Sequence, residues 1–277
     1  MRYTQIKTKN ATKLALSAIL VLVLSWSLGN VYFFEELNQD AEFLKEDTTG
    51  FTHKDTTPTN AVDHDPIYIN WNDDSDLNDF NGDGSESNPY IIEDLTIIDE
   101  SSSHGIQIRN TDVHIVIRNC TIEVTAGTKA AIYLNNATHV NVSYNDVSNS
   151  YFGVRLSESN DNVVHNNTCV SNSQAISVIE NSDNNNITDN YCVQSTTYSV
   201  IYLSDSSDNF LSGNNCSEND MGEPAITLYN TINTEVVDNY CSNNEIAITL
   251  RNTSQTTLQN NEMFDCGVRI RDGVDEV

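Results

Sequence analysis

One short hydrophobic motif recurs along most of the chain. Each copy has an apolar residue, a variable residue and a second apolar residue, followed two positions later by Asn, Asp or Glu. The alternation has a period of two and predicts one short β-strand per copy. The copies lie 20 to 26 residues apart, too close for propeller blades, which take about 40–45 residues. The first apolar positions are Ile106, Ile132, Val154, Ile176, Ile201, Ile226, Ile248 and Val268.

A second series of apolar positions repeats in step with the first. It comprises Ile122, Val147, Cys169, Cys192, Cys216, Cys241 and Met263. Two residues before each stands an Asn, except at the first, which has Cys120: Asn145, Asn167, Asn190, Asn214, Asn239 and Asn261. Asn tolerates left-handed backbone and hydrogen-bonds neighbouring backbone groups in turns. These six residues are therefore predicted to form a structural ladder.

A unit of two or three short strands cannot bury its apolar side alone. Stacking such units on one another produces a continuous narrow core, which predicts a solenoid with one coil per repeat. Equivalent residues should then lie one strand spacing apart, about 4.8 Å. A leucine-rich repeat has a similar length, but the helices and Leu pattern it needs are absent from the sequence.

The N-terminal residues are typical of an export signal. Residues 1–13 carry four basic residues and no acid, and Leu14 begins an apolar run that continues with interruptions to Phe34. Residues 1–34 are either a cleaved signal peptide or a membrane anchor. The rest is expected to be exported, at a cell surface, in a periplasm or outside the cell, with membrane contact only through this segment. We expect an acidic polar linker at 35–64 and the solenoid domain at 65–277, with an N-terminal cap at 66–104.

Charge limits the classes of partner. The chain has 40 Asp and Glu against 13 Lys and Arg, a formal net charge of −27. This balance excludes nucleic acid, which is bound through Lys and Arg, and anionic membrane surfaces. Neutral glycans, cations and basic partners remain. Acids at the C-terminal edge (Asp272, Asp275 and Glu276) are expected to blunt edge pairing and keep the protein monomeric.

Two segments of the chain resemble a known family. Gly82 to Ile92, which includes Asn88-Pro89-Tyr90-Ile91-Ile92, and the Asn166-Asn167-Thr168 element resemble the NosD-like repeats of the pectin-lyase-like superfamily. The resemblance covers about residues 66–272. It implies an all-β, right-handed parallel β-helix of about eight or nine coils, preceded here by the N-terminal signal or anchor helix. It also implies two alternative functions, a polysaccharide lyase or glycoside hydrolase and a periplasmic accessory protein.

Catalytic motifs of the superfamily are present only in fragments. Ser103-His104-Gly105 and Arg269-Ile270-Arg271-Asp272 lie at opposite ends of the expected rod and cannot form one site. The resemblance also suggests copper binding. It assigns copper binding to no residue here, because Met263 belongs to a core series and Met221 stands alone. The sequence favours a non-catalytic surface, adhesion-type or glycan-binding module.

Three outer-face features could carry binding. Tyr133, Arg155 and Tyr202 share the outward position of the first strand, where they could stack on sugar rings; ordinary β-propensity also explains Tyr there. Glu158, Glu180 and Asp205 share another position on consecutive coils, where they could act as carboxylate ligands for a cation or simply form turns. His114, His139 and Asp161 share another, as transition-metal ligands or as a solvated polar row.

A calcium loop and a cysteine column complete the expectations. Asp79, Asn81 and Asp83 precede Gly84 with the spacing of the first EF-hand ligands, although Tyr90 replaces the usual Glu, and a Gly-rich turn is the alternative. No other cofactor is indicated. Cys169, Cys192, Cys216 and Cys241 should face inward as one column. Neighbours could pair as disulfides or remain reduced thiols, because parallel side chains give an unfavourable torsion.

Overall fold

A computed structural model describes residues 61–270 except 102, 126, 220 and 221. The predicted N-terminal segment, most of the linker and the acids after residue 270 lie outside the described residues. Within them, no helix is long and apolar enough to cross a membrane.

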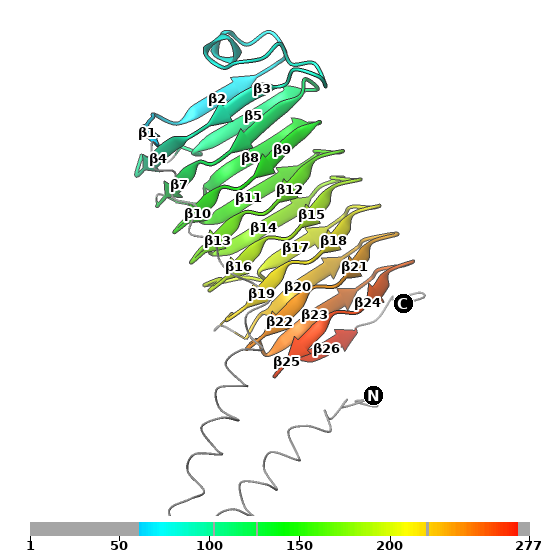
Figure 1. The fold of residues 1–277 in the computed structure, drawn as a ribbon. Helices are drawn as coiled ribbons and strands as arrows, with labels where there is room; N and C mark the ends of the chain where they lie inside the picture. The colour runs from blue at the N-terminus through cyan, green and yellow to red at the C-terminus, as the bar shows by residue number, and fades with distance from the viewer. Residues whose placement is uncertain (1–60, 102, 126, 220–221, 271–277) are drawn as a thin grey trace, which may run out of the picture. The chain divides into compact units, whose positions relative to one another are not determined.

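The described chain is a right-handed parallel β-helix, as the sequence predicted (Figure 1). Three parallel sheets run along it, two with nine strands and one with eight. We call them sheets A, B and C. Sheet A contains β1 (Val62–Asp63), β4 (Leu95–Asp99), β7 (Thr121–Val124), β10 (Asp146–Ser148), β13 (Thr168–Val170), β16 (Tyr191–Val193), β19 (Asn215–Ser217), β22 (Tyr240–Ser242) and β25 (Glu262–Phe264).

Sheet B carries the first sequence motif and has the longest strands. It contains β2 (Ile67–Asn70), β5 (Ile106–Thr111), β8 (Ala130–Ala137), β11 (Phe152–Ser157), β14 (Gln174–Ile179), β17 (Ile201–Ser204), β20 (Pro224–Tyr229), β23 (Ile246–Arg251) and β26 (Gly267–Ile270). Sheet C contains β3 (Tyr90–Glu93), β6 (Ile115–Arg118), β9 (Val140–Ser143), β12 (Val163–His165), β15 (Asn186–Thr188), β18 (Phe210–Ser212), β21 (Glu235–Val237) and β24 (Thr257–Gln259).

The first coil is closed by irregular chain. Between β2 and β3 lie the 3₁₀ helix η2 (Ser75–Asp79) and a glycine-rich loop. Gly82 has φ +121°, and a Cβ there would lie 2.1 Å from the Pro89 carbonyl oxygen, so only glycine fits. β1 pairs with β4, so residues 62 and 63, at the end of the expected linker, are already part of the solenoid.

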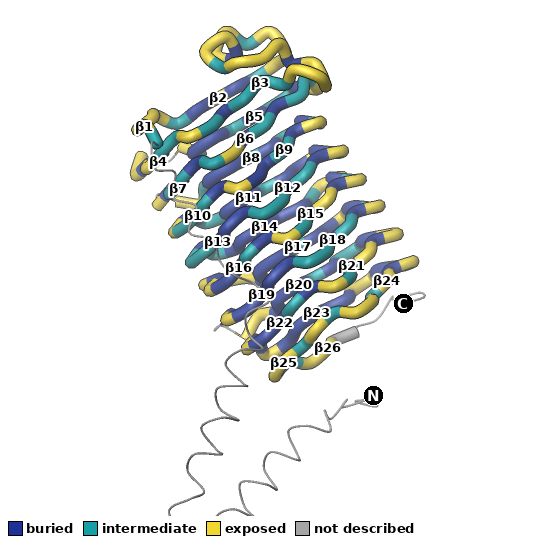
Figure 2. The backbone as a smooth tube through the Cα atoms, viewed as in Figure 1, coloured by how far each residue is buried: buried dark blue, intermediate teal, exposed yellow. Residues whose placement is uncertain are grey.

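The core is a stack of side chains from all three sheets (Figure 2). Cys169, Cys192 and Cys216 lie at the same level as Val147 in successive sheet A strands. These side chains and that of Cys241 are fully buried, and all six cysteines are free thiols. Burial raises the pKa of Cys192 and Cys216 well above the usual thiol value, because the interior disfavours a thiolate.

A ladder of buried asparagines closes the corner between sheets C and A. The side-chain oxygen of Asn190 accepts hydrogen bonds from both the backbone and the side-chain nitrogen of Asn167, each 3.0 Å long. Its Nδ2 donates to the Val164 carbonyl at 2.9 Å and to Asn214 Oδ1 at 2.9 Å. The same pattern links the members of the series: Asn145, Asn167, Asn190, Asn214, Asn239 and Asn261.

Other corners use the same device, which the sequence analysis did not find. Between sheets B and C, Asn162, Asn185 and Asn209 are buried, and each accepts from the backbone nitrogen of the preceding coil. Between sheets A and B, the Asn172 side chain accepts a hydrogen bond from the backbone N–H of Ser150, and the Asn244 side chain accepts one from the backbone N–H of Asn219. Side-chain amides therefore pair backbone groups that the turns leave without strand partners.

Left-handed residues bend the chain at each corner. Glu158, Glu180 and Asp205 have φ of 53°, 57° and 52°, so this carboxylate row occupies turn positions. His139 and Asp161 are also left-handed, with φ of 61° and 57°. Asn and Asp dominate these positions because their short polar side chains tolerate this conformation.

We expect that Asn190→Ala lowers the free energy of unfolding by about 3 kcal/mol, because it leaves the Asn167 N–H and the Val164 C=O buried without partners. Asn186→Ala is the matched control. Its side chain is exposed in the same coil, so a change within about 0.5 kcal/mol is expected. Urea unfolding followed by circular dichroism measures both, and equal losses would contradict a special role for the ladder.

The thiol column should be unreactive in the folded protein. At pH 8 we expect a thiol reagent such as DTNB to modify Cys266 alone, the one cysteine that is not fully buried, and all six cysteines after unfolding in denaturant. The raised thiol pKa values and the lack of access both slow the reaction. Fewer than six thiols after unfolding without reductant would instead indicate disulfides within the column.

Candidate functional site

Two long connections lie close together at the corner between sheets A and B. Residues 194–200 join β16 to β17 and residues 218–223 join β19 to β20, whereas the connections into the neighbouring strands β11, β14 and β23 have three residues each. They account for the two 25-residue spacings around Ile201 in the repeat. Side chains from both connections, including Tyr198, Ser199 and Glu223, line a groove over the outer face of sheet B.

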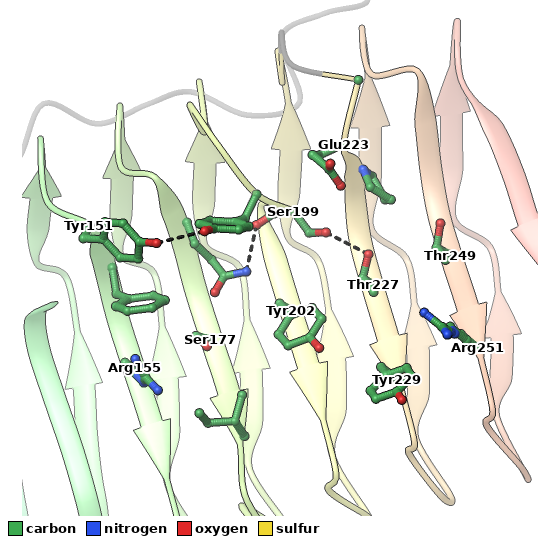
Figure 3. A pocket seen from close by; sticks show the side chains of 16 residues that line it. Tyr151, Arg155, Ser177, Ser199, Tyr202, Glu223, Thr227, Tyr229, Thr249 and Arg251 are labelled. Atoms are coloured by element: carbon green, nitrogen blue, oxygen red, sulfur yellow. Dashed lines mark hydrogen bonds between the residues drawn. The ribbon is translucent and has the colours of Figure 1, made fainter. Parts of the chain in front are cut away.

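The groove has a volume of about 610 Å³ and crosses five neighbouring strands from β11 to β23 (Figure 3). Its floor is a register row, one residue from each strand: Arg155, Ser177, Tyr202, Thr227 and Thr249. The aromatic ring of Tyr202 lies near the middle of the row, between small hydroxyl residues. The floor therefore combines one stacking surface with several hydrogen-bonding groups.

Aromatic rings gather at one end of the groove. The Tyr151 and Tyr198 hydroxyls are 2.9 Å apart and their ring centroids 5.9 Å apart. The hydrogen bond with Tyr198 raises the pKa of Tyr151. The Arg155 guanidinium carbon lies 4.4 Å from the centroid of Phe152, a cation–π contact. At the other end, Arg251 stands 5.1 Å from the Tyr229 centroid.

The hydroxyl groups of the floor are only partly engaged. Ser199 Oγ and Thr227 Oγ1 are 2.8 Å apart, and Gln174 Nε2 donates to the Ser199 carbonyl at 3.3 Å. Thr249 Oγ1 is buried and has no hydrogen-bond partner among the described residues.

Comparison with known proteins places the chain in a family. The model of the family described as "Periplasmic copper-binding protein (NosD)" matches residues 84–274, more than half of the chain. The chain belongs to the NosD family. No curated protein matches this sequence.

Solved structures share the fold of this NosD-family chain. They include the periplasmic alginate epimerase AlgG (16% identity, TM-score 0.51, 64% of this chain and 50% of the epimerase). The tailspike protein of E. coli bacteriophage HK620 is similar (16% identity, TM-score 0.56, 68% of this chain and 40% of the tailspike). So is an alginate lyase from Paenibacillus sp. str. FPU-7 (13% identity, TM-score 0.50, 77% of this chain and 89% of the lyase). The chain thus spans half or less of the first two proteins, and the likeness to all three concerns the fold.

The structure distributes the predicted glycan-binding residues of this NosD-family chain along one row. Arg155 and Tyr202 line the groove, separated by Ser177. Tyr133 is in register with Arg155 on β8 and lies just beyond the groove. The sequence analysis missed Tyr151, Tyr198 and Arg251. The longer repeats around Ile201 were the available signal, since extra residues must form a loop at a corner.

The other predicted features do not converge on a metal. The His114 and His139 rings stack with their centroids 4.7 Å apart. In the described part of the chain, no three His, Cys, Asp or Glu side chains form a group that could hold a metal ion. The fragments around His104 and Arg269 fall at β5 and β26, near opposite ends of sheet B.

The predicted calcium loop forms part of the N-terminal cap. Asp79 ends η2, and Asn81 forms a backbone bridge with Ile91. Asp83 Oδ1 accepts the Ser85 backbone N–H at 3.0 Å, and hydrogen bonds with Ser85 lower the pKa of Asp83. The loop is therefore a turn held by Asp83, and calcium binding by Asp79, Asn81 and Asp83 stays a prediction.

Calorimetric titration of the protein with Ca²⁺ decides this prediction. Binding at the loop should produce heat that Asp83→Asn removes, because the amide keeps the turn to Ser85 but loses the charged ligand. Absence of heat at millimolar Ca²⁺ would eliminate the site.

Proposed function

We propose that this NosD-family protein is an exported β-helix that binds polysaccharide along the outer face of sheet B without cleaving it. The observation that carries the proposal is the groove over β11 to β23, with its aromatic rings, hydroxyl groups and two arginines. The family is periplasmic by its description, which agrees with the export signal in the sequence. Residues 1–34 would either be removed or hold the β-helix at the membrane.

The geometry of the groove suits an extended sugar chain. Its floor follows the solenoid axis, with equivalent residues repeated at the strand spacing of about 4.8 Å, close to the length of one sugar unit in an extended chain. Aromatic rings such as Tyr202 and Tyr151 offer apolar faces for pyranose rings, and Ser and Thr hydroxyls both donate and accept hydrogen bonds. An elongated, shallow groove also fits a polymer better than a compact small molecule, which prefers a concave pocket.

The acid count of the groove supports binding without hydrolysis. Glycoside hydrolysis uses two carboxyl groups flanking the scissile bond, whereas Glu223 is the single acid among the residues that line the groove. A carbohydrate-active enzyme is the second candidate, since similar folds occur in an alginate epimerase and an alginate lyase. A fold hosts many activities, so the residues of the groove weigh more here than the likeness.

Copper, named in the family description, does not fit the described residues. Soft copper sites use accessible thiolate, thioether or imidazole ligands. Here Cys192 and Cys216 are fully buried with pKa values raised by desolvation, and the stacked His114 and His139 have no third ligand grouped with them in the described part of the chain. We therefore assign no copper chemistry to these residues.

The test is a panel of neutral and acidic polysaccharides in affinity electrophoresis, with reducing ends and unsaturated products measured in parallel. We expect retardation by at least one polymer and no products. Tyr202→Ala should weaken binding about tenfold, the loss of one stacked ring. Tyr144→Ala, which removes an exposed ring at the corner between sheets C and A, should leave binding unchanged. Failure of the whole panel, or equal binding by both variants, would contradict the proposal.

A further inference from the structure

A second cluster lies on the same face, beside the groove toward the N-terminal end. It contains His104, Lys129, Tyr133 and Arg155, which come from the connections preceding β5 and β8 and from strands β8 and β11. The His104 and Tyr133 rings contact each other with centroids 4.7 Å apart and ring planes inclined by 33°. The Arg155 guanidinium carbon lies 5.8 Å from the Tyr133 centroid. We call these four residues the cationic subsite.

The hydrogen bond of His104 fixes its tautomer. The Ala130 backbone N–H donates to His104 Nδ1 at 3.0 Å, so Nδ1 carries no proton and the neutral ring has its proton on Nε2. Burial, followed by the positive charge of Lys129, lowers the pKa of His104 to about 4. At neutral pH the ring is therefore a hydrogen-bond donor through Nε2, and neither nitrogen is free to accept a proton from a substrate.

Positive charge is concentrated on this face. Of the six Lys and Arg between residues 61 and 270, only Arg118 lies on another sheet, where it forms an ion pair with Glu93. Arg109, Lys129, Arg155 and Arg251 lie in or next to strands of sheet B, and the sixth, Arg269, belongs to β26. Within the described residues, Lys129 and Arg155 form no ion pair, although the whole chain has a net charge of −27.

Arg155 contacts aromatic rings and is paired with no acid among the described residues. Its contacts are the faces of Phe152 and Tyr133, and its Nε is buried without a hydrogen-bond partner in the described part of the chain. Along with burial, the positive charges of Lys129 and Arg155 both lower the pKa of His104, so the potential at this cluster is positive. A bound anion would offset it, and a planar guanidinium matches a carboxylate in particular.

We propose that the cationic subsite binds the carboxylate of an acidic sugar, within a polysaccharide that continues into the groove. The inference rests on the proposed function. Lys129, Arg155 and His104 Nε2 all donate, which suits a carboxylate better than sugar hydroxyls that must also donate. Tyr133 and Tyr202 are three strand spacings apart along the row, about 14 Å, so one hexasaccharide could contact both.

The experiment compares hexagalacturonate with its fully methyl-esterified form, which has the same rings and no charge. The full 277-residue chain, purified in a non-ionic detergent, is titrated with each by calorimetry. We expect the acid to bind at least about tenfold more tightly than the ester, with a preference that shrinks at high salt. Arg155→Gln should remove most of this preference, with a much larger loss of affinity for the acid than for the ester, and Arg118→Gln, the matched loss of charge on sheet C, should change neither affinity.

The outcomes separate the two proposals. Equal affinity for acid and ester, or an equal loss of both in Arg155→Gln, would overturn the cationic subsite and leave polysaccharide binding in place. No binding of either hexasaccharide would also overturn the subsite, and the polysaccharide panel then decides the proposed function. Circular dichroism of each variant shows that a loss of binding is not a loss of fold.

Discussion

The structure depends on the pairing of backbone groups at its corners. Along the strands, every coil hydrogen-bonds to the next, but each turn leaves N–H and C=O groups that no strand can reach. Buried asparagines bond to these groups, and one amide serves two coils: Asn190 accepts from Asn167 and donates to the Val164 carbonyl. An unpaired backbone group in this narrow core would cost about 1–3 kcal/mol. The many asparagines of the chain are thus explained by the number of corners.

This constraint divides the chain into two kinds of position. Inward residues are fixed by the stack, so they are apolar, Cys or hydrogen-bonded Asn, Ser and Thr. Outward residues on the sheets, and residues inserted at corners, can vary without disturbing it. The groove arises at positions of the second kind, since Tyr198 and Glu223 come from lengthened connections and Tyr202 from an outward strand position. The same scaffold can therefore carry a binding face without any change to its core.

Predictability from sequence follows the same division. The coils, the thiol column and the ladder from Asn145 to Asn261 could be predicted because stacking repeats each residue type at a regular interval. The series Asn162, Asn185 and Asn209 between sheets B and C was not found because it is short: in the next coil Thr234 takes the place of Asn. Asn is also common throughout the chain, so three copies do not stand out. Tyr151 and Tyr198 could not be paired from sequence, since they are 47 residues apart and one of them lies in a connection unique to its coil. A periodic pattern gives the scaffold, whereas the site is made of departures from it.

The distribution of charge distinguishes the proposed binding face from the rest of the surface. An exported chain with 40 acids and 13 bases repels polyanions from most of its surface, yet Arg155 and Arg251 stand on aromatic rings within one groove and form no ion pair in the described part of the chain. Arginine on an aromatic face keeps its charge while covering apolar surface. Because the surrounding acids would repel a misplaced acidic polymer, the few cations can select the face and register of binding with little total charge. Under the proposed function, the acidic composition would exclude an acidic polymer from the rest of the surface while the cationic subsite admits it.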